Sequence, residues 1–268
     1  MVKFIVKHKL PIAVVIGVGL ICAVLLALVY LRVIKLNTPS RKAYPVHGAD
    51  VSSYQGDIDW AILSENLDFV FIKATEGSKH LDGKFAYNYA EACGTDLRVG
   101  AYHFFSFESG GDTQADNYIA NVEKFDGMLP PVVDVELYGD YRADPLPAED
   151  VVPQLKTLLE KLEEHYGVKP IIYATGTAYN MYVKEDLADY DLWIRSVYFK
   201  PESSKQWTFW QYSDTATLDG YDGEEKHIDL NVFNGSAEEF KKYGCAEWLK
   251  YKLKFVQSYK TKFFSKNA

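Results

Sequence analysis

The chain has 268 residues and a formal net charge of −8 at pH 7, and 48% of its residues are hydrophobic. This length allows one large domain or two small ones with a sizeable core. Residues 1–44 and 241–268 are basic, whereas residues 45–240 hold 36 acids and 14 bases. The central part is therefore strongly negative, which argues against nucleic acid as a partner. The sequence has no metal-binding Cys or His spacing and no phosphate-binding glycine motif, so we expect no metal and no cofactor.

The chain begins with a hydrophobic run that is typical of a membrane-spanning helix. Residues 12–31 are uncharged and mostly apolar, which is long enough to cross a bilayer. A cleaved signal peptide would have a shorter apolar core and a small-x-small cleavage site, and a buried core helix is rarely so long at this position. We therefore predict a short basic tail over 1–11, an uncleaved signal anchor over 12–34 and a linker over 35–44. Basic residues flank the run on both sides, so we choose the simpler topology, with the large domain outside the cytoplasm.

Strands and helices alternate over residues 45–243, the predicted globular domain. The predicted strands are Val46–Ser52, Phe69–Thr75, Arg98–Phe105, Pro131–Glu136, Lys169–Ala174, Asp191–Val197, Trp207–Tyr212 and His227–Phe233. The predicted helices are Asp59–Asn66, Phe85–Cys93, Asp112–Phe125, Ala148–Tyr166 and Ala178–Val183. Five strand–helix pairs are thus followed by three strands with connections too short for full helices. This order predicts an α/β protein with a modified, TIM-like closed barrel of parallel character.

Residues 244–268 form a basic tail in which large apolar residues alternate with lysine. The pattern is compatible with an edge strand, an amphipathic helix on an anionic membrane, a cell-wall contact or a solvated tail. The sequence leaves these alternatives open.

Two acids lie close together in the short apolar strand around residues 132–135. Side chains alternate along a strand, so Asp134 and Glu136 face the same side. Crowded carboxylates move their pKa values apart, so that one can stay protonated as an acid while the other is charged. A surface strand end with two solvated acids is the alternative reading of this motif alone.

Active sites of such barrels lie at the carboxyl ends of the strands. Polar or aromatic residues occupy nearly all of these predicted ends, where packing alone would favour Val, Ile and Leu. They are Asp50, Glu76, Tyr102, His103, Asp134, Glu136, Tyr173, Trp193, Arg195, Trp210, Gln211 and Asp229. Converging acids and aromatic rings, without a metal or nucleotide motif, indicate glycoside hydrolysis. That reaction needs one protonated carboxyl group and a second group that stabilises the transition state or activates water.

Eight segments in this order resemble glycoside hydrolase family 25, the Chalaropsis-type lysozymes or N-acetylmuramidases. The match runs from Val46 to Phe240. The segments are HGADVSSYQGDIDW from residue 47, FVFIKATEG from 69, GAYHFF from 100, PPVVDVE from 130, IIYA from 171, LWI from 192, FWQYS from 209 and IDLNVF from 228.

The resemblance implies a (β/α)5(β)3 barrel that cleaves the β-1,4 bond between N-acetylmuramic acid and N-acetylglucosamine in peptidoglycan. It implies Glu136 as general acid and Asp134 as an assisting carboxylate, with Asp50 and Asp229 as the other acids of the cleft. Which acid acts as base, nucleophile or orienter of the N-acetyl group stays open. We expect substrate contacts from Glu76, Tyr102, Tyr173, Trp193, Arg195, Trp210 and Gln211. The expected partners are peptidoglycan glycan strands and, through the N-terminal helix, a membrane, and we favour a monomer.

One segment departs from the family pattern. After Leu192-Trp193-Ile194 the family usually has a small residue and then an aromatic one, but here Arg195 and Ser196 follow. A cation at this point can pair with a cleft acid, bind a substrate carboxylate or face outward. We expect His103 to be a structural or lining residue, and Glu76 either to pair with Lys73 or Arg195 or to contact sugar.

Two other functions compete with the muramidase interpretation. A chitinase of family 18 carries D-x-x-D-x-D-x-E, but the two upstream acid positions are Leu129 and Val132 here. A non-catalytic glycan-binding module would be favoured by the loss of a cleft acid, and none is missing.

Overall fold

The computed structural model describes residues 2–125, 127–202 and 206–244, with side chains described from residue 12 onward. The chain divides into two units, Met1–Thr38 and Pro39–Ala268. The end of the predicted linker belongs to the second unit, because Arg41 forms an ion pair with Asp68 at 3.0 Å and Tyr44 packs against Trp207. Apart from Gly244, the predicted C-terminal tail lies outside the described residues.

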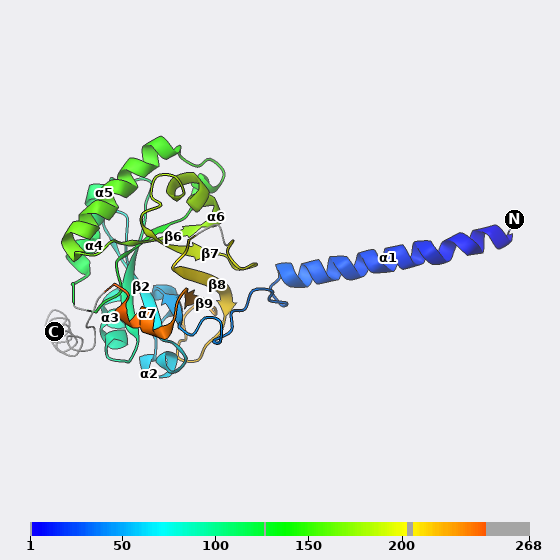
Figure 1. The fold of residues 1–268 in the computed structure, drawn as a ribbon, viewed down its shortest axis with the longest axis horizontal. Helices are drawn as coiled ribbons and strands as arrows, with labels where there is room; N and C mark the ends of the chain where they lie inside the picture. Colours follow the sequence, from blue (N-terminus) through cyan, green and yellow to red (C-terminus); the bar gives the residue numbers. More distant parts are fainter. Residues whose placement is uncertain (1, 126, 203–205, 245–268) are drawn as a thin grey trace. The chain divides into compact units, whose positions relative to one another are not determined.

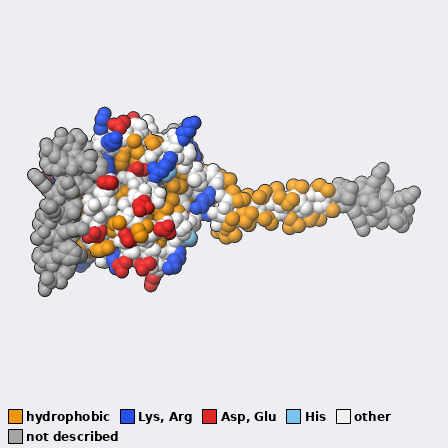
Figure 2. Space-filling view, turned by 90° about the horizontal axis from the view of Figure 1, so that it is seen from below, with side chains coloured by type: hydrophobic (Ala, Val, Ile, Leu, Met, Phe, Trp, Pro, Cys, Tyr) orange, Lys and Arg blue, Asp and Glu red, His pale blue; other side chains and the backbone are white. Residues whose placement is uncertain are grey.

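The first unit contains one long helix, α1 (Val2–Tyr30). Its segment Ile12–Tyr30 has 19 residues with a mean hydropathy of 3.2, and none of this segment is buried. Hydrophobic side chains follow one another along it in Figure 2. The helix is therefore long and apolar enough to cross a membrane, although a signal sequence has the same properties. Its exposure argues against a core helix.

The second unit is an eight-stranded barrel with one short additional strand (Figure 1). Around the barrel the strands follow one another in the order β1, β9, β8, β7, β6, β5, β4 and β2. Pairing of β1 with β2 closes the ring. The strands are β1 (His47–Val51), β2 (Phe69–Glu76), β3 (His80–Leu81), β4 (Arg98–Phe104), β5 (Val132–Val135), β6 (Ile171–Thr175), β7 (Asp191–Arg195), β8 (Phe209–Ala216) and β9 (Ile228–Phe233). The predicted barrel, with five strand–helix units and then three strands, is confirmed.

One strand runs against the others. Neighbouring barrel strands are parallel except at β9, which is antiparallel to both β1 and β8. No helix returns the chain between β8 and β9, and strands joined without a crossover run antiparallel. The prediction that Asp229 stands at a carboxyl strand end is therefore wrong. It lies near the amino end of β9 and still reaches the same end of the barrel, because it is the register partner of Asp50.

Helices surround the barrel and differ little from those predicted. The main ones are α3 (Phe85–Cys93), α4 (Gly111–Asn121), α5 (Ala148–Tyr166) and α7 (Ala237–Lys242), and the short ones are η1 (Ser53–Gln55), α2 (Trp60–Leu63), η2 (Ser64–Asn66), η3 (Gly139–Arg142), α6 (Gly176–Ala178) and η4 (Tyr179–Val183, a π-helix). Asp59 caps α2 through the amides of Ala61 and Ile62, as predicted. Helix α4 ends four residues earlier than predicted. The Asn121 amide binds the carbonyl of Asn117, which competes with the backbone for the last turn.

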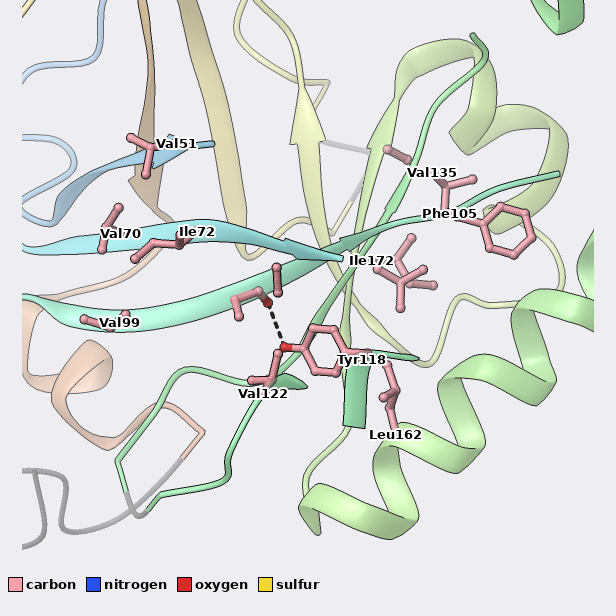
Figure 3. Close-up of a cluster of buried hydrophobic side chains, with 14 of the residues drawn as sticks. Val51, Val70, Ile72, Val99, Phe105, Tyr118, Val122, Val135, Leu162 and Ile172 are labelled. Carbon is pink, nitrogen blue, oxygen red and sulfur yellow. Dashed lines mark hydrogen bonds between the residues drawn. The ribbon is translucent and has the colours of Figure 1, made fainter. Parts of the chain in front are cut away.

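The larger core lies between the strands and the helices. Outward-facing strand residues meet the inner faces of α4 and α5, which lie side by side (Figure 1). Figure 3 shows Tyr118 of α4 and Leu162 of α5 among these side chains, and the Tyr118 hydroxyl donates to the Ala101 carbonyl at 3.0 Å. The strand residues drawn there include Val51, Val70, Ile72, Val99, Val135 and Ile172. This layer fixes the direction of each strand and hence of its inward-facing residues.

A second core fills the barrel itself near the amino ends of the parallel strands. It is built around aromatic rings, among them Phe69, Phe71, Phe209, Phe233 and Phe240 of α7. The Phe71 ring stacks on Trp193 with 4.7 Å between centroids. We call the five phenylalanine rings the phenylalanine plug. A guanidinium below it, that of Arg98, donates to the carbonyls of Phe240 and Tyr243, which holds α7 across this end.

Two glycines make the plug possible. Gly48 of β1 and Gly100 of β4 flank β2 on its two sides. A Cβ atom at Gly48 would lie 2.5 Å from the Phe69 ring, and one at Gly100 would lie 2.6 Å from the Phe71 ring. Both distances are far inside van der Waals contact, so only glycine leaves room for these rings.

Candidate active site

A cavity of about 180 Å³ lies at the opposite end of the barrel interior, around the carboxyl ends of the parallel strands. Its lining residues come from all eight barrel strands and from the segments that follow β1 and β5. They are Asp50, Ser52, Tyr54, Lys73, Tyr102, Phe104, Asp134, Glu136, Tyr173, Trp193, Gln211 and Asp229. All four predicted catalytic acids are thus brought together, with four of the seven predicted substrate-binding residues: Tyr102, Tyr173, Trp193 and Gln211.

Strand β5 supplies two of the acids. Val132, Asp134 and Glu136 alternate with residues that face the outer core, so both carboxylates point into the barrel mouth. Asp134 is 8% exposed, and its Oδ1 has no hydrogen-bond partner among the described residues. Burial, and then the charge of Glu136, raise the pKa of Asp134 well above its usual range. Asp134 is therefore a carboxyl group that lines the cavity and has one buried oxygen without a hydrogen-bond partner among the described residues.

The other two acids are tied together by amide side chains. Gln211 Nε2 donates to Asp50 Oδ1 at 3.1 Å and to Asp229 Oδ2 at 2.9 Å. Asn231 Nδ2 donates to Asp50 Oδ1 at 2.7 Å. Burial is the largest cause that raises the pKa of each carboxyl, while the amide bonds oppose the rise at Asp50 and the Asp50 charge adds to it at Asp229. The amides hold both acids in fixed positions on one side of the cavity.

Aromatic residues complete this network. The Tyr173 hydroxyl donates to Gln211 Oε1 at 2.9 Å, and Trp193 Nε1 donates to Asn231 Oδ1 at 2.8 Å. Their rings meet edge to face with 4.7 Å between centroids. Because each polar atom of Gln211 has a partner, the orientation of its amide is determined. The amide nitrogen must face the two carboxylates, and the amide oxygen must face the tyrosine.

One cation faces these acids. Lys73 of β2 lines the cavity, and its Nζ lies 2.7 Å from Glu76 Oε2 and 4.9 Å from the centre of the Phe104 ring. Its charge lowers the pKa of Asp134, against the larger effect of burial. Of the alternatives considered for Glu76, the pairing with Lys73 is the one found in the structure. Glu76 itself does not line the cavity.

Two further predicted site residues lie away from the cavity. Trp210 is 2% exposed and packs in the outer core, where its Nε1 donates to the carbonyl of Ser196 at 2.9 Å. It follows Phe209 and precedes Gln211, which both face inward, so alternation directs it outward. Arg195, at the end of β7, forms an ion pair with Asp214. It does not line the cavity, but its charge lowers the pKa of Asp50 and Asp229.

His103 is structural, as expected. It is fully buried on the outer side of β4, 2.7 Å from Thr75 Oγ1 and 3.0 Å from Gln114 Oε1 of α4. Burial lowers its pKa to about 4. It is thus a neutral link between two strands and a helix at neutral pH.

Sequence reasoning did not assign site roles to Lys73, Phe104, Asn231, Ser52 and Tyr54. A signal for the first was present, because Phe69, Phe71 and Lys73 share one face of β2. The role of Asn231 had no such signal, since it depends on the antiparallel pairing of β9 with β1. Tyr54 lies in η1 after β1, and no strand pattern extends to it.

The arrangement combines acids of different environments in one small space. One carboxyl group has a buried oxygen with no hydrogen-bond partner among the described residues, two are held by amides, and Glu136 stands at the mouth side of β5. Such a set can donate a proton to one atom of a substrate and stabilise positive charge at another. No cluster of His, Cys, Asp or Glu suited to a metal ion occurs in the described part of the chain.

Comparisons with known proteins agree with this geometry. Residues 49–221 match the family model of glycosyl hydrolases family 25. A solved family 25 glycosyl hydrolase from Bacillus anthracis is 51% identical, with a TM-score of 0.73 over 78% of this chain and 97% of that one. Lysozyme M1 of Streptomyces globisporus is 32% identical over 72% of this chain and 69% of its own length. The N,O-diacetylmuramidase of Chalaropsis sp is 29% identical over 74% and 98%. This chain therefore belongs to family 25 of the glycosyl hydrolases and is a glycoside hydrolase.

Proposed function

We propose that the enzyme hydrolyses peptidoglycan at the β-1,4 bond between N-acetylmuramic acid and N-acetylglucosamine. The observation that carries the proposal is the convergence of four acids and five aromatic side chains in one cavity of a family 25 barrel. The names lysozyme and diacetylmuramidase, borne by relatives that share most of the barrel, support the choice of substrate.

Glu136 is the general acid of the proposed reaction. It stands at the mouth end of β5, and no side-chain hydrogen bond occupies it among the described residues. A carboxyl group in that position can give its proton to the glycosidic oxygen as the bond to the anomeric carbon breaks. The leaving sugar then departs as a neutral alcohol.

Asp134 assists from deeper in the cavity. Its Oδ1 has no protein partner and its position next to Glu136 on β5 is fixed by the strand. In a substrate-assisted reaction the Asp134 carboxylate accepts the N–H of the substrate's N-acetyl group, which directs the acetyl oxygen at the anomeric carbon to form a cyclic intermediate. Water then attacks the same carbon and gives a proton to the Glu136 carboxylate, which releases the acetyl oxygen and completes the hydrolysis. The bond from the substrate then offsets the energetic cost of the unpaired buried acceptor.

Asp50 and Asp229 hold the remaining side of the sugar. Gln211 and Asn231 fix both carboxylates, so these acids do not need to rearrange when positive charge develops on the sugar ring. Tyr102, Tyr173 and Trp193 form the walls against which the ring packs. Arg195 and Glu76 stand outside this set.

An aromatic shelf extends the site beyond the cavity. Phe104 lines the cavity, and the Tyr138 ring lies 5.3 Å from it. The Phe107 ring is stacked on Tyr138 with 5.5 Å between centroids, and Tyr141 lies 4.9 Å from Phe107. We assign these four rings to neighbouring sugars of a long glycan strand, because partly exposed rings offer flat apolar faces.

The N-terminal helix suggests where the enzyme works. We propose that α1 anchors it in a membrane with the barrel outside the cytoplasm, where peptidoglycan is found. Segment Ile12–Tyr30 has the length and hydropathy of a span. Fractionation of cells that express the full chain tests this: protein of full mass is expected in the membrane fraction and accessible to external protease. Soluble protein that lacks the first 30 or so residues would instead show that the segment is a cleaved signal.

The reaction is tested by digesting purified peptidoglycan with the full-length protein in detergent and identifying the new reducing ends by mass spectrometry. Muramic acid ends are expected. Glucosamine ends would keep a hydrolase but place the cut at the other bond. Rapid cleavage of chitin oligomers at a rate equal to that of peptidoglycan would contradict the proposed substrate.

A further inference from the structure

Arg195 stands at the edge of the site without a role in the reaction proposed above. It ends strand β7, two residues after Trp193, so the two side chains belong to the same inward face of the strand. Its register partners are Thr175 on β6 and Gln211 on β8. Arg195 therefore lies one inward position beyond Trp193 along β7 and beside Gln211, and both of these residues line the cavity.

Its guanidinium is only partly engaged. The side chain is 32% exposed, and it forms an ion pair with Asp214, whose side chain is 19% exposed. A guanidinium carries five N–H donors, and a single side-chain bond, from Nη2, is found within the described residues. The Asp214 carboxylate thus holds the group in place, while further donors remain for a ligand.

The charges of the cavity make a second cation necessary if the ligand is an anion. The cavity contains four acids, and its one lining cation, Lys73, is paired with Glu76. A substrate carboxylate would be repelled there unless a second cation stood near its path. Arg195 is close enough to lower the pKa of Asp50, Asp229 and Tyr173, so its charge acts within the cavity that these residues line.

We propose that Arg195 is a specificity-determining residue that binds a carboxylate of the muramoyl substituent. This inference rests on the proposed function and names the group of the substrate that is recognised. The carboxylate belongs either to the lactyl group itself or to the peptide attached to it. An arginine fork matches a carboxylate with two parallel hydrogen bonds, which a lysine does not reproduce.

Three substrates separate these sources: peptide-free glycan with free lactyl carboxylates, the same glycan as its methyl ester, and glycan with intact peptides. The wild-type full-length enzyme is expected to prefer a carboxylate-bearing glycan over the ester. Arg195→Ala should raise KM for that glycan about tenfold or more, with kcat nearly unchanged and little effect on the ester. Arg195→Lys should recover only part of the loss. If KM rises for the peptide-free glycan, the bound carboxylate is that of the lactyl group. If it rises only for the glycan with intact peptides, the carboxylate belongs to the peptide.

Arg41→Ala is the matched control, because it removes an arginine from an Asp ion pair at the other end of the barrel, where Asp68 precedes β2. It should leave every KM unchanged. An equal loss on ester and acid for Arg195→Ala would overturn the inference.

Calorimetry separates failure of the inference from failure of the proposed function. If nothing is cleaved, binding of acid and ester forms to the same proteins still decides the role of Arg195. An Arg195-dependent preference for the acid supports the inference, and its absence contradicts it.

Discussion

The two ends of the barrel interior are built from the same strands and differ almost completely in chemistry. Along β2 the inward residues change from Phe69 and Phe71 to Lys73, and along β8 they change from Phe209 to Gln211. Only one step of two residues separates the phenylalanine plug from the cavity. The end with the phenylalanine plug, here called the lower end, therefore supplies apolar burial. The end with the cavity, here called the upper end, places acids where burial raises their pKa.

This contrast shows how the fold tolerates a site that is costly to form. Buried carboxylates without full solvation destabilise the folded chain. The five rings of the phenylalanine plug, one of which belongs to α7, offset that cost within the same barrel. We therefore expect substitutions at the lower end to change stability, and those at the upper end to change activity.

The largest expected effect on stability comes from Phe71→Ala. This residue is fully buried between Phe69, Phe209 and Trp193, so its removal should lower the free energy of unfolding by about 3–5 kcal/mol. Chemical denaturation of the full chain measures it. Phe104→Ala is the control at the cavity end, where the ring is only partly buried and the loss should be much smaller. Equal losses would contradict a division of labour between the two ends.

His103 should make the barrel sensitive to acid. Its pKa is lowered from 6.5 to about 4 by burial, so the unfolded chain takes up a proton at this residue before the folded one does. Its contribution to stability is complete above pH 6.5 and is lost as the pH falls from 6.5 toward 4, by about 3 kcal/mol in total. His103→Gln should remove this part of the pH dependence in denaturation curves.

The control for this effect is His80→Gln, because that side chain is exposed on β3. It should leave the curve of stability against pH as in the wild type. If both variants retained the full acid sensitivity, its source would lie elsewhere in the barrel.

Asp134→Asn should separate activity from stability. The carboxyl pKa is raised in the folded state, so its contribution to stability decreases as the pH rises, and the neutral amide should leave stability at pH 7 unchanged or higher. The rate kcat should fall about 100-fold, because the assisting carboxylate is lost. Activity assays and thermal unfolding of the same samples measure both. If the Asp134→Asn variant were less stable than wild type but fully active, Asp134 would be a structural residue and not the assisting carboxylate.

The smallest expected effect concerns the aromatic shelf. Tyr141→Ala should lower kcat/KM on polymeric peptidoglycan by a few-fold and leave short fragments unaffected, because the ring lies outside the cavity. Kinetics on fragments of increasing length test this. A loss on the shortest fragments would place Tyr141 in the central site instead.

Much of this account could be predicted from the sequence, because it depends on local periodicity. The strand–helix order and the shared face of Asp134 and Glu136 follow from alternation within single elements. Pairing between distant strands does not. The antiparallel course of β9, and with it the bond from Asn231 to Asp50, is decided by a connection that carries no helix.

Misplaced residues have equally local causes. Trp210 was predicted to contact substrate because it is aromatic and lies near the carboxyl end of its predicted strand, but its parity on β8 directs it into the outer core. Arg195 has the correct parity and still stops short of the cavity, because Asp214 holds its guanidinium. The position of a residue in the alternation along a strand determines which face its side chain lies on. The group that the side chain binds determines whether it reaches the cavity.

The central claim is that Glu136 donates the proton that breaks the glycosidic bond. The most direct measurement is the rate of formation of muramic acid reducing ends from peptidoglycan by full-length wild type, Glu136→Gln and Glu76→Gln, with glycan binding measured in parallel. Glu136→Gln is expected to lose at least about 100-fold in rate while it still binds glycan, and Glu76→Gln, altered outside the cavity, should remain active. A Glu136→Gln protein that is folded, binds glycan and cleaves at the wild-type rate would contradict the account.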